Sequence, residues 1–153
     1  MALLNLPSRG LTMKIEKILY TAYARSTGGR EGTSETSDGG VNVRLTVPKE
    51  FGGPGGAGTN PEQLFAMGYS ACFTSSMKYV AMLDKIKIPD DTSIDASVGI
   101  GRIPSGFGIE VELKITVPGM DKAQVQTIVD KAHQVCAYSN ATRGNIELKL
   151  TIL

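Results

Sequence analysis

Hydrophobic and polar residues alternate along several short segments of this chain, a period of two that is typical of strands with one buried and one solvated face. The first segment is rich in β-forming residues, and the others alternate cleanly. Strands are therefore predicted at residues 15–25, 41–47, 94–103, 109–117 and 146–152. The polar stretch 26–40 has no apolar residue to bury and is predicted to be a loop, or a hairpin with a long connection.

Two other segments carry the signals of helices. One helix is predicted from Thr59 to about Asp84, because Asn60 can cap its first turn and Pro61 fits the position after the cap. The second is predicted over residues 121–136, where apolar residues recur at the spacing of an amphipathic helix. Strands with one wet face, joined largely by hairpins and carrying two helices, predict an α+β fold with an antiparallel sheet.

The chain is predicted to form a single domain over residues 13–153, because no linker or internal repeat divides it. Residues 1–12 are predicted to be a flexible N-terminal extension or a product of start-codon choice, since Met13 stands directly before the first patterned segment. The first residues lack the positively charged leading region of a secretory signal. The expected compartment is therefore the cytoplasm.

Composition excludes several classes of function. Sixteen Lys and Arg against 15 Asp and Glu leave a net charge of +1, which argues against a nucleic-acid partner. No segment approaches the roughly 18 apolar residues of a membrane span. Two cysteines and one histidine cannot build a tetrahedral zinc site, so no metal is expected. Residues 53–58 match a GxGxxG pattern but lack the acidic residue about 20 positions later that would hold a ribose, so no nucleotide cofactor is expected.

The two cysteines are the main candidates for chemistry. Cys72 lies in the middle of the first predicted helix and Cys136 at the end of the second. Three interpretations are open: two inert core thiols, a structural disulfide, or a redox pair. A reducing cytoplasm weighs against the structural disulfide, and two helical positions that could meet weigh slightly for the redox pair.

A nucleophilic Cys72 needs a nearby cation, because an apolar helix face raises the pKa of a thiol. The candidate cations are Arg25, Arg30, Lys78 and Arg143. Arg30 stands in a glycine-rich turn where a side chain can be aimed inward, although a solvated charge is the ordinary interpretation of a loop arginine.

A stripe of small residues surrounds Cys72. Gly68, Cys72 and Ser76 follow one another at intervals of four along the predicted helix. Glycine inside a helix costs about 1 kcal/mol relative to alanine. The stripe therefore indicates that another group packs very close, whether a partner helix, a second subunit or a ligand.

Several stretches of sequence closely resemble the organic hydroperoxide resistance proteins (Ohr) of the OsmC/Ohr family. The longer ones are GTNPEQLF at 58–65, GYSACF at 68–73 and AHQVCAYSNATRGNI at 132–146; the shorter ones are YTA at 20–22, GGREG at 28–32 and IGRIPSGFG at 100–108. The resemblance runs from about Met13 to the C-terminus. The residues around the two cysteines, GYSAC and YSNATRGN, resemble the Ohr branch more closely than the osmotically induced OsmC branch.

The resemblance implies a thiol-dependent peroxidase that reduces organic hydroperoxides, alkyl or fatty-acyl, to alcohols. Cys72 falls on the family's peroxidatic cysteine and Cys136 on its resolving cysteine, so that a sulfenic acid on Cys72 is followed by a Cys72–Cys136 disulfide. Arg30 and Glu62 fall on the arginine and glutamate of the family's active-site charge network.

The resemblance also implies a fold and partners. The expected fold has antiparallel sheets wrapping a central cysteine-bearing helix, in an intertwined homodimer with active sites at the subunit interface. No cofactor is expected to be bound; the reductant is dihydrolipoamide or the lipoyl groups of lipoylated proteins. Phe73 and Phe107 are the candidates for an apolar surface that favours organic hydroperoxides over hydrogen peroxide.

Two features fit the family pattern less simply. Ten residues separate Glu62 from Cys72, about 15 Å along an unbroken helix, so Arg30 can contact both only if the helix breaks near Gly68 or the chain bends. The family usually has proline after the resolving cysteine, where this chain has Ala137. The alternatives to the Ohr function are an OsmC-type peroxidase, a thiol redox sensor, or a binding domain for apolar small molecules.

Overall fold

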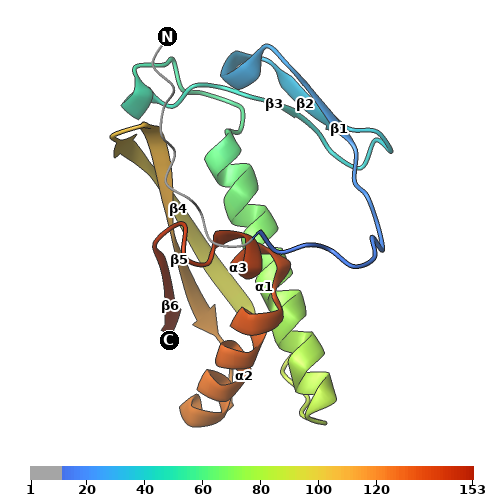
Figure 1. Ribbon diagram of the computed structural model, residues 1–153. Coiled ribbons are helices and arrows are strands. Elements are labelled where there is room, and N and C mark those ends of the chain that lie inside the picture. Colours follow the sequence, from blue (N-terminus) through green and yellow to red (C-terminus); the bar gives the residue numbers. More distant parts are fainter. Residues whose placement is uncertain (1–11) are drawn as a thin grey trace.

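The computed structural model describes residues 12–153, and the extension predicted for residues 1–12 lies, apart from Thr12, outside them. The chain forms two parts (Figure 1). A long helix, a three-stranded sheet and a second helix pack into one body, and a second three-stranded sheet made by the N-terminal segment stands beside the start of the long helix. The α+β class predicted from the sequence is confirmed.

The long helix α1 (Pro61–Leu83) begins and ends almost as predicted. The side chain of Asn60 accepts a hydrogen bond from the backbone N–H of Gln63 at 2.8 Å, which satisfies one of the free donors of the first turn. Pro61 occupies the first helical position, where no N–H is needed. The helix then runs without interruption to Leu83.

The larger sheet has the strand order β4–β5–β6. Strands β4 (Ser93–Ile103) and β5 (Gly106–Thr116) form an antiparallel hairpin, whose turn is shorter than the predicted 104–108. Strand β6 (Leu148–Ile152) pairs with β5 in parallel, with Leu148 opposite Val111. The prediction of a wholly antiparallel sheet is therefore wrong at this edge: the sheet is mixed, because helical residues carry the chain back to the start of β5 before β6 begins.

The core lies between this sheet and the helices. Alternate residues of β5 point inward, and Val111, Leu113 and Ile115 are buried. They pack against the apolar faces of α1 and of α2 (Lys122–Val135), which Asp121 caps by accepting from two backbone N–H groups. Completely buried residues of the two helices include Tyr69, Phe73, Met77, Val129 and Ala132. This core fixes α1, the helix that carries Cys72.

A short helix that the sequence did not predict follows directly after α2. Helix α3 (Ala137–Thr142) begins at the residue after Cys136, where the predicted second helix ends. Its six residues are polar or small and show no apolar period, so no pattern separates them from a loop.

The N-terminal sheet buries none of its residues in this chain. It consists of β1 (Ala24–Thr27), β2 (Thr33–Thr36) and β3 (Asn42–Arg44), with single 3-10 turns at Gly29–Glu31 and Lys49–Phe51. The predicted hairpin within 26–40 is present, but the strand predicted at 15–25 is wrong except for its last two residues. Residues 15–23 are exposed, since no other strand of the described chain lies against them.

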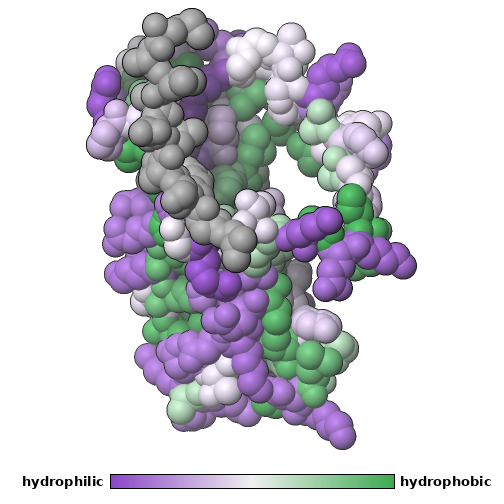
Figure 2. Space-filling view, viewed as in Figure 1, coloured by the Kyte–Doolittle hydropathy of each residue, from purple (hydrophilic) through white to green (hydrophobic). Residues whose placement is uncertain are grey.

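Apolar side chains of this exposed segment face the solvent. Figure 2 shows hydrophobic residues at the surface on the right of the molecule, where the N-terminal segment arches away from the body. Leu19 is 89% exposed and Tyr20 is 80% exposed. Among residues 12–153, no helix is long and apolar enough to cross a membrane.

Candidate active site

The structure brings the two cysteines together. Cys72 lies in the middle of α1 and is half-buried; Cys136 is completely buried between α2 and α3. The thiol of Cys136 lies 3.5 Å from Sγ of Cys72, within hydrogen-bond range for sulfur, and both thiols are free. The two sulfurs therefore need only a short approach to reach the length of a disulfide bond.

Backbone hydrogen bonds on both sides fix the position of Cys136. Its N–H donates to the carbonyl of Ala132 in the last turn of α2, and its carbonyl accepts from Asn140 in the first turn of α3. The backbone of Cys136 itself is extended, with φ −64° and ψ 123°. This conformation ends helix α2 and lets α3 start in a new direction. The thiol thus sits at a bend that is held from both ends.

Burial raises the pKa of the Cys72 thiol, and the neighbouring Cys136 thiol also raises it. The backbone N–H groups of Tyr138 and Ala137, in the first turn of α3, act in the opposite direction because they stabilise the thiolate. Among the described residues, none of the groups that shift this pKa is a cationic side chain. One chain alone therefore leaves Cys72 without the positive charge that a reactive thiolate needs.

Arg30 and Glu62 form an ion pair with two parallel hydrogen bonds of 2.8 Å and 2.6 Å. The hydrogen bonds with the partner raise the pKa of Arg30 and lower that of Glu62. Gly28 and Gly29 both have positive φ, and this turn aims the Arg30 side chain at the start of α1. The guanidinium also lies over the ring of Phe51, with its carbon 5.5 Å from the ring centre.

This ion pair does not meet the cysteines within one chain. Helix α1 does not break near Gly68, so the condition under which Arg30 could contact both Glu62 and Cys72 within one chain is not met, and Glu62 lies about 15 Å along the axis from Cys72. Gly68 instead makes room for Tyr138 of α3: a Cβ at Gly68 would lie 2.8 Å from the Tyr138 hydroxyl oxygen. The close neighbour that the small-residue stripe indicates is therefore a side chain of the same chain.

The two phenylalanines suggested for substrate contact lie in different environments. Phe73 is completely buried in the core. Phe107, at the end of the β4–β5 hairpin, is 66% exposed and lines a cavity of about 820 Å³. Other apolar residues of this cavity are Phe65, Ile100, Ile103, Ile109 and Ile146, which the sequence analysis did not single out because each belongs to an ordinary strand or helix pattern.

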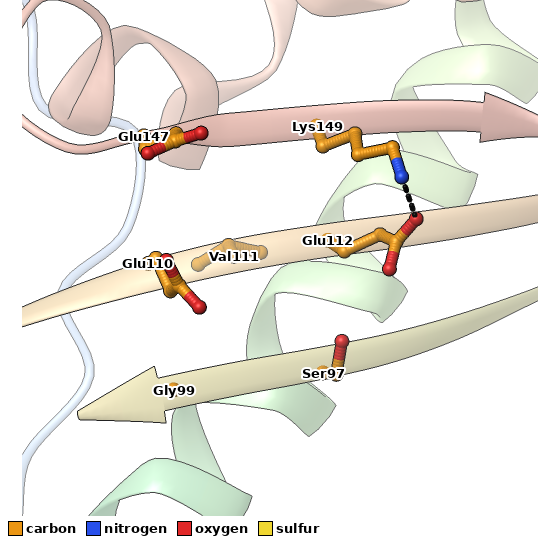
Figure 3. Close-up of a pocket in the computed structure, with 7 residues that line it drawn as sticks. All are labelled: Ser97, Gly99, Glu110, Val111, Glu112, Glu147 and Lys149. Atoms are coloured by element: carbon orange, nitrogen blue, oxygen red, sulfur yellow. Dashed lines mark ion pairs between the residues drawn. The ribbon is translucent and has the colours of Figure 1, made fainter.

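A smaller polar hollow lies on the outer face of the β4–β5–β6 sheet (Figure 3). Glu110 and Glu112 point outward from β5, and Lys149 of β6 forms an ion pair with Glu112 at 3.1 Å. No group of three His, Cys, Asp or Glu side chains in the described part of the chain is placed to hold a metal ion. This hollow is separated from the cysteines by the sheet itself, so it belongs to the solvated surface.

Comparison with known proteins decides the family. The family model described as OsmC-like protein matches residues 53–151. The chain belongs to the OsmC/Ohr family. It is 66% identical over 137 residues to the organic hydroperoxide resistance protein of Xanthomonas axonopodis pv. citri, a match that covers 90% of this chain and 96% of that one.

Two crystal structures of Ohr proteins share the fold of this OsmC/Ohr-family chain. The organic hydroperoxide resistance protein from Elizabethkingia anophelis superposes with a TM-score of 0.84 at 50% identity, covering 89% of this chain and 97% of that one. OhrB of Bacillus subtilis superposes with a TM-score of 0.80 at 38% identity, covering 89% of this chain and all of that one. The resemblance to the Ohr branch stated from the sequence is confirmed.

Replacing Ala137 with proline tests the backbone contribution to the thiolate. The fold is expected to persist, because proline suits the first position of α3 and Cys136 has the extended backbone that proline requires before it. Proline removes one of the two N–H groups that lower the pKa of Cys72, so this pKa is expected to rise. Alkylation of Cys72 at pH 7 should therefore slow several-fold.

The measurement is the pH dependence of alkylation in a Cys136→Ser background, so that Cys72 alone reacts. Ala137→Gly is the matched control, because it changes the same side chain and keeps the N–H. An unchanged or lowered pKa in Ala137→Pro, with the control at the parent value, contradicts the assignment.

Proposed function

We propose that this OsmC/Ohr-family protein is a thiol peroxidase that reduces organic hydroperoxides to alcohols. Its family places it among proteins of peroxide detoxification. The observation that carries the finer proposal is the 3.5 Å separation of the Cys72 and Cys136 sulfurs, one half-buried and one enclosed. Two thiols at this distance can pass from attack on a peroxide to a disulfide with little rearrangement.

The chemistry proceeds in three balanced steps. The Cys72 thiolate attacks the distal oxygen of the hydroperoxide, the O–O bond breaks, and the alcohol leaves with one proton while Cys72 becomes a sulfenic acid. The Cys136 thiol then attacks the sulfenic sulfur, and a disulfide forms with loss of water. A dithiol finally opens the disulfide by exchange, is itself oxidised to a disulfide, and returns both cysteines to thiols. We propose dihydrolipoamide or a protein-bound dihydrolipoyl group as this dithiol.

The cation that activates Cys72 comes, on this proposal, from a second copy of the chain. Within one chain the Arg30–Glu62 pair lies about 15 Å along α1 from Cys72. A charge at that distance gives little stabilisation of a thiolate near a protein surface. In a homodimer the Arg30 guanidinium of one chain can approach the Cys72 of the other, with Glu62 holding its orientation.

The exposed N-terminal segment supports an intertwined homodimer. A three-stranded sheet with no buried residue is not stable on its own, and β1–β3 has none. The segment before it carries a row of exposed apolar side chains: Met13, Ile15, Ile18, Leu19, Tyr20 and Tyr23. A second copy that covers this segment would bury them, and it would bring in the Arg30 that follows on the 3-10 turn.

Preference for organic hydroperoxides is proposed to come from the apolar cavity at the β4–β5 hairpin. Phe107, Phe65 and Ile146 line this cavity, which has room for an alkyl chain. Burial of an alkyl chain in this cavity makes the binding free energy of an organic hydroperoxide more favourable, whereas hydrogen peroxide has no apolar group to bury. Phe73 does not contribute to this preference because the core encloses it.

Steady-state turnover tests the proposal directly. The protein is given tert-butyl hydroperoxide or hydrogen peroxide, each with dihydrolipoamide and separately with thioredoxin. We expect fast turnover only with dihydrolipoamide and at least about tenfold higher kcat/KM for the organic peroxide, since burial of a few methyl groups is worth that much.

Other outcomes point to the alternatives. Equal rates with both peroxides, or a different reductant, would favour an OsmC-type peroxidase. One equivalent of peroxide consumed without turnover under any reductant would favour a thiol redox sensor.

A further inference from the structure

Three buried hydroxyl groups join α1 to the short helix that follows Cys136. The phenol oxygen of Tyr69 lies 2.9 Å from Oγ of Ser139 and 3.1 Å from Oγ1 of Thr142. Tyr69 and Ser139 are completely buried, and Thr142 is 7% exposed. Enclosed hydroxyls are costly unless they are hydrogen-bonded, so this network favours one relative position of α1 and α3.

The direction of each hydrogen bond follows from the backbone carbonyls at the end of the network. Oγ1 of Thr142 lies 2.9 Å from the carbonyl oxygen of Tyr138 and 3.3 Å from that of Ser139, and a carbonyl oxygen can only accept. Thr142 therefore donates its single proton to the backbone of α3 and accepts from Tyr69, and Tyr69 accepts from Ser139. The donors run from Ser139 through Tyr69 and Thr142 to the backbone of α3, with each hydroxyl donating once.

The network lies next to both reacting thiols. Tyr69 precedes Cys72 by three residues, about one turn of α1, and Ser139 follows Cys136 by three residues. Helix α3 has only six residues, too few to hold a position by its own hydrogen bonds. The ring of Tyr138 adds an apolar contact, with its centre 5.5 Å from the centre of the Tyr69 ring.

We infer that Tyr69, through Ser139 and Thr142, positions Cys136 for formation of the disulfide. The two sulfurs need to approach by only about 1.5 Å, from 3.5 Å to the roughly 2.0 Å of a disulfide bond. This short approach depends on α3 staying against α1, and the three hydroxyls are its buried polar attachment. Tyr69 is thus a positioning residue that acts through the backbone of α3. Its place in catalysis rests on the proposed function, but its effect on the thiol pair does not.

Equilibration of the full-length protein with reduced and oxidised glutathione tests the positioning without any peroxide. Two protein thiols are oxidised to the Cys72–Cys136 disulfide while one glutathione disulfide is reduced to two glutathione molecules. In Tyr69→Phe, which deletes only the hydroxyl, the equilibrium constant is expected to fall by at least about tenfold, because α3 no longer holds Cys136 in place. Tyr79→Phe, the same change at an exposed position of α1, is expected to keep the wild-type constant. A wild-type constant in a folded Tyr69→Phe protein overturns the inference.

A second pair of variants decides the question if Tyr69→Phe does not fold. Thr142→Ser keeps the hydroxyl and should keep the wild-type constant, whereas Thr142→Val removes it at almost unchanged volume and should lower the constant. Equal constants in these two variants also overturn the inference.

A peroxide experiment separates this inference from the proposed function. Wild type and Tyr69→Phe are each treated with tert-butyl hydroperoxide. Cys72 of the variant is expected to be oxidised at a rate within about twofold of wild type, but the disulfide is expected to form at least about tenfold more slowly. Mass spectrometry should then show sulfinic acid on Cys72 at peroxide concentrations that leave the wild type as a disulfide. Disulfide formation at the wild-type rate overturns the inference. Failure of the wild type to reduce the hydroperoxide refutes the proposed function, and the glutathione experiment still decides the role of Tyr69.

Discussion

Cys72→Ser is expected to abolish reduction of organic hydroperoxides, with a loss of more than roughly a thousandfold in turnover, because a serine hydroxyl does not form the nucleophilic anion near neutral pH. The substitution is small and Cys72 is half-buried, so the fold should be unchanged. Dihydrolipoamide-dependent loss of tert-butyl hydroperoxide measures the effect, and circular dichroism checks the fold. Full activity in this variant would refute the mechanism.

Cys136→Ser serves as the contrasting variant. It keeps the attacking thiol but lacks the group that closes the disulfide. One equivalent of peroxide should therefore oxidise Cys72 to a sulfenic acid, and a second equivalent should oxidise it to a sulfinic acid and end the reaction. Sustained wild-type turnover by Cys136→Ser would show that the 3.5 Å pair is not used for resolution.

A dimer assembled from one Arg30→Ala chain and one Cys72→Ser chain is expected to recover about half of wild-type activity, although each variant alone should be nearly inactive. If Arg30 acts across the interface, one site of this heterodimer combines Cys72 of the first chain with Arg30 of the second and is complete. The other site lacks both groups. Two different affinity tags allow the heterodimer to be purified, and hydroperoxide turnover measures its activity.

A dimer of wild type with the double variant Arg30→Ala, Cys72→Ser is the matched control. Across the interface, each of its sites lacks one group, so it should be nearly inactive. If each site were instead built within one chain, this control would keep half of the activity and the first heterodimer would keep none. A site shared between two chains and a site built within one chain thus give opposite results. The unbroken helix α1, which keeps the Arg30–Glu62 pair away from Cys72 of the same chain, favours the shared site.

Helices α1 and α2 could be predicted well because their signals are local. Asn60 caps α1 and Asp121 caps α2 in the structure, as side chains of these types do at helix starts. Alternation also found β4 and β5, whose pairing needs only a hairpin turn. The parallel pairing of β6 has no such signal, since a period of two tells which face is buried but not which strand lies alongside. The segment 15–23 has the composition of a strand and no partner for it in the described chain.

The sequence predicted which residues of the candidate site form pairs, but it did not predict how the cysteine pair and the ion pair lie relative to each other. The structure joins Cys72 with Cys136 and Arg30 with Glu62, and it keeps these two pairs apart. Sequence alone left that separation open, because it depends on whether α1 continues through Gly68. The hydroxyl network of Tyr69 could not be foreseen, since its partners lie 70 and 73 residues away on a helix with no apolar period.

The parallel pairing of β6 with β5 has a consequence for the protein as it leaves the ribosome. The chain between these neighbouring strands contains α2, Cys136 and α3, so the sheet cannot be completed until the last residues have been synthesised. Cys72 emerges much earlier, and throughout that interval it has no second thiol beside it. If Cys72 is oxidised to a sulfenic acid in that interval, the nascent chain has no resolving thiol of its own, and the sulfenic acid stays open to further oxidation until Cys136 has been synthesised.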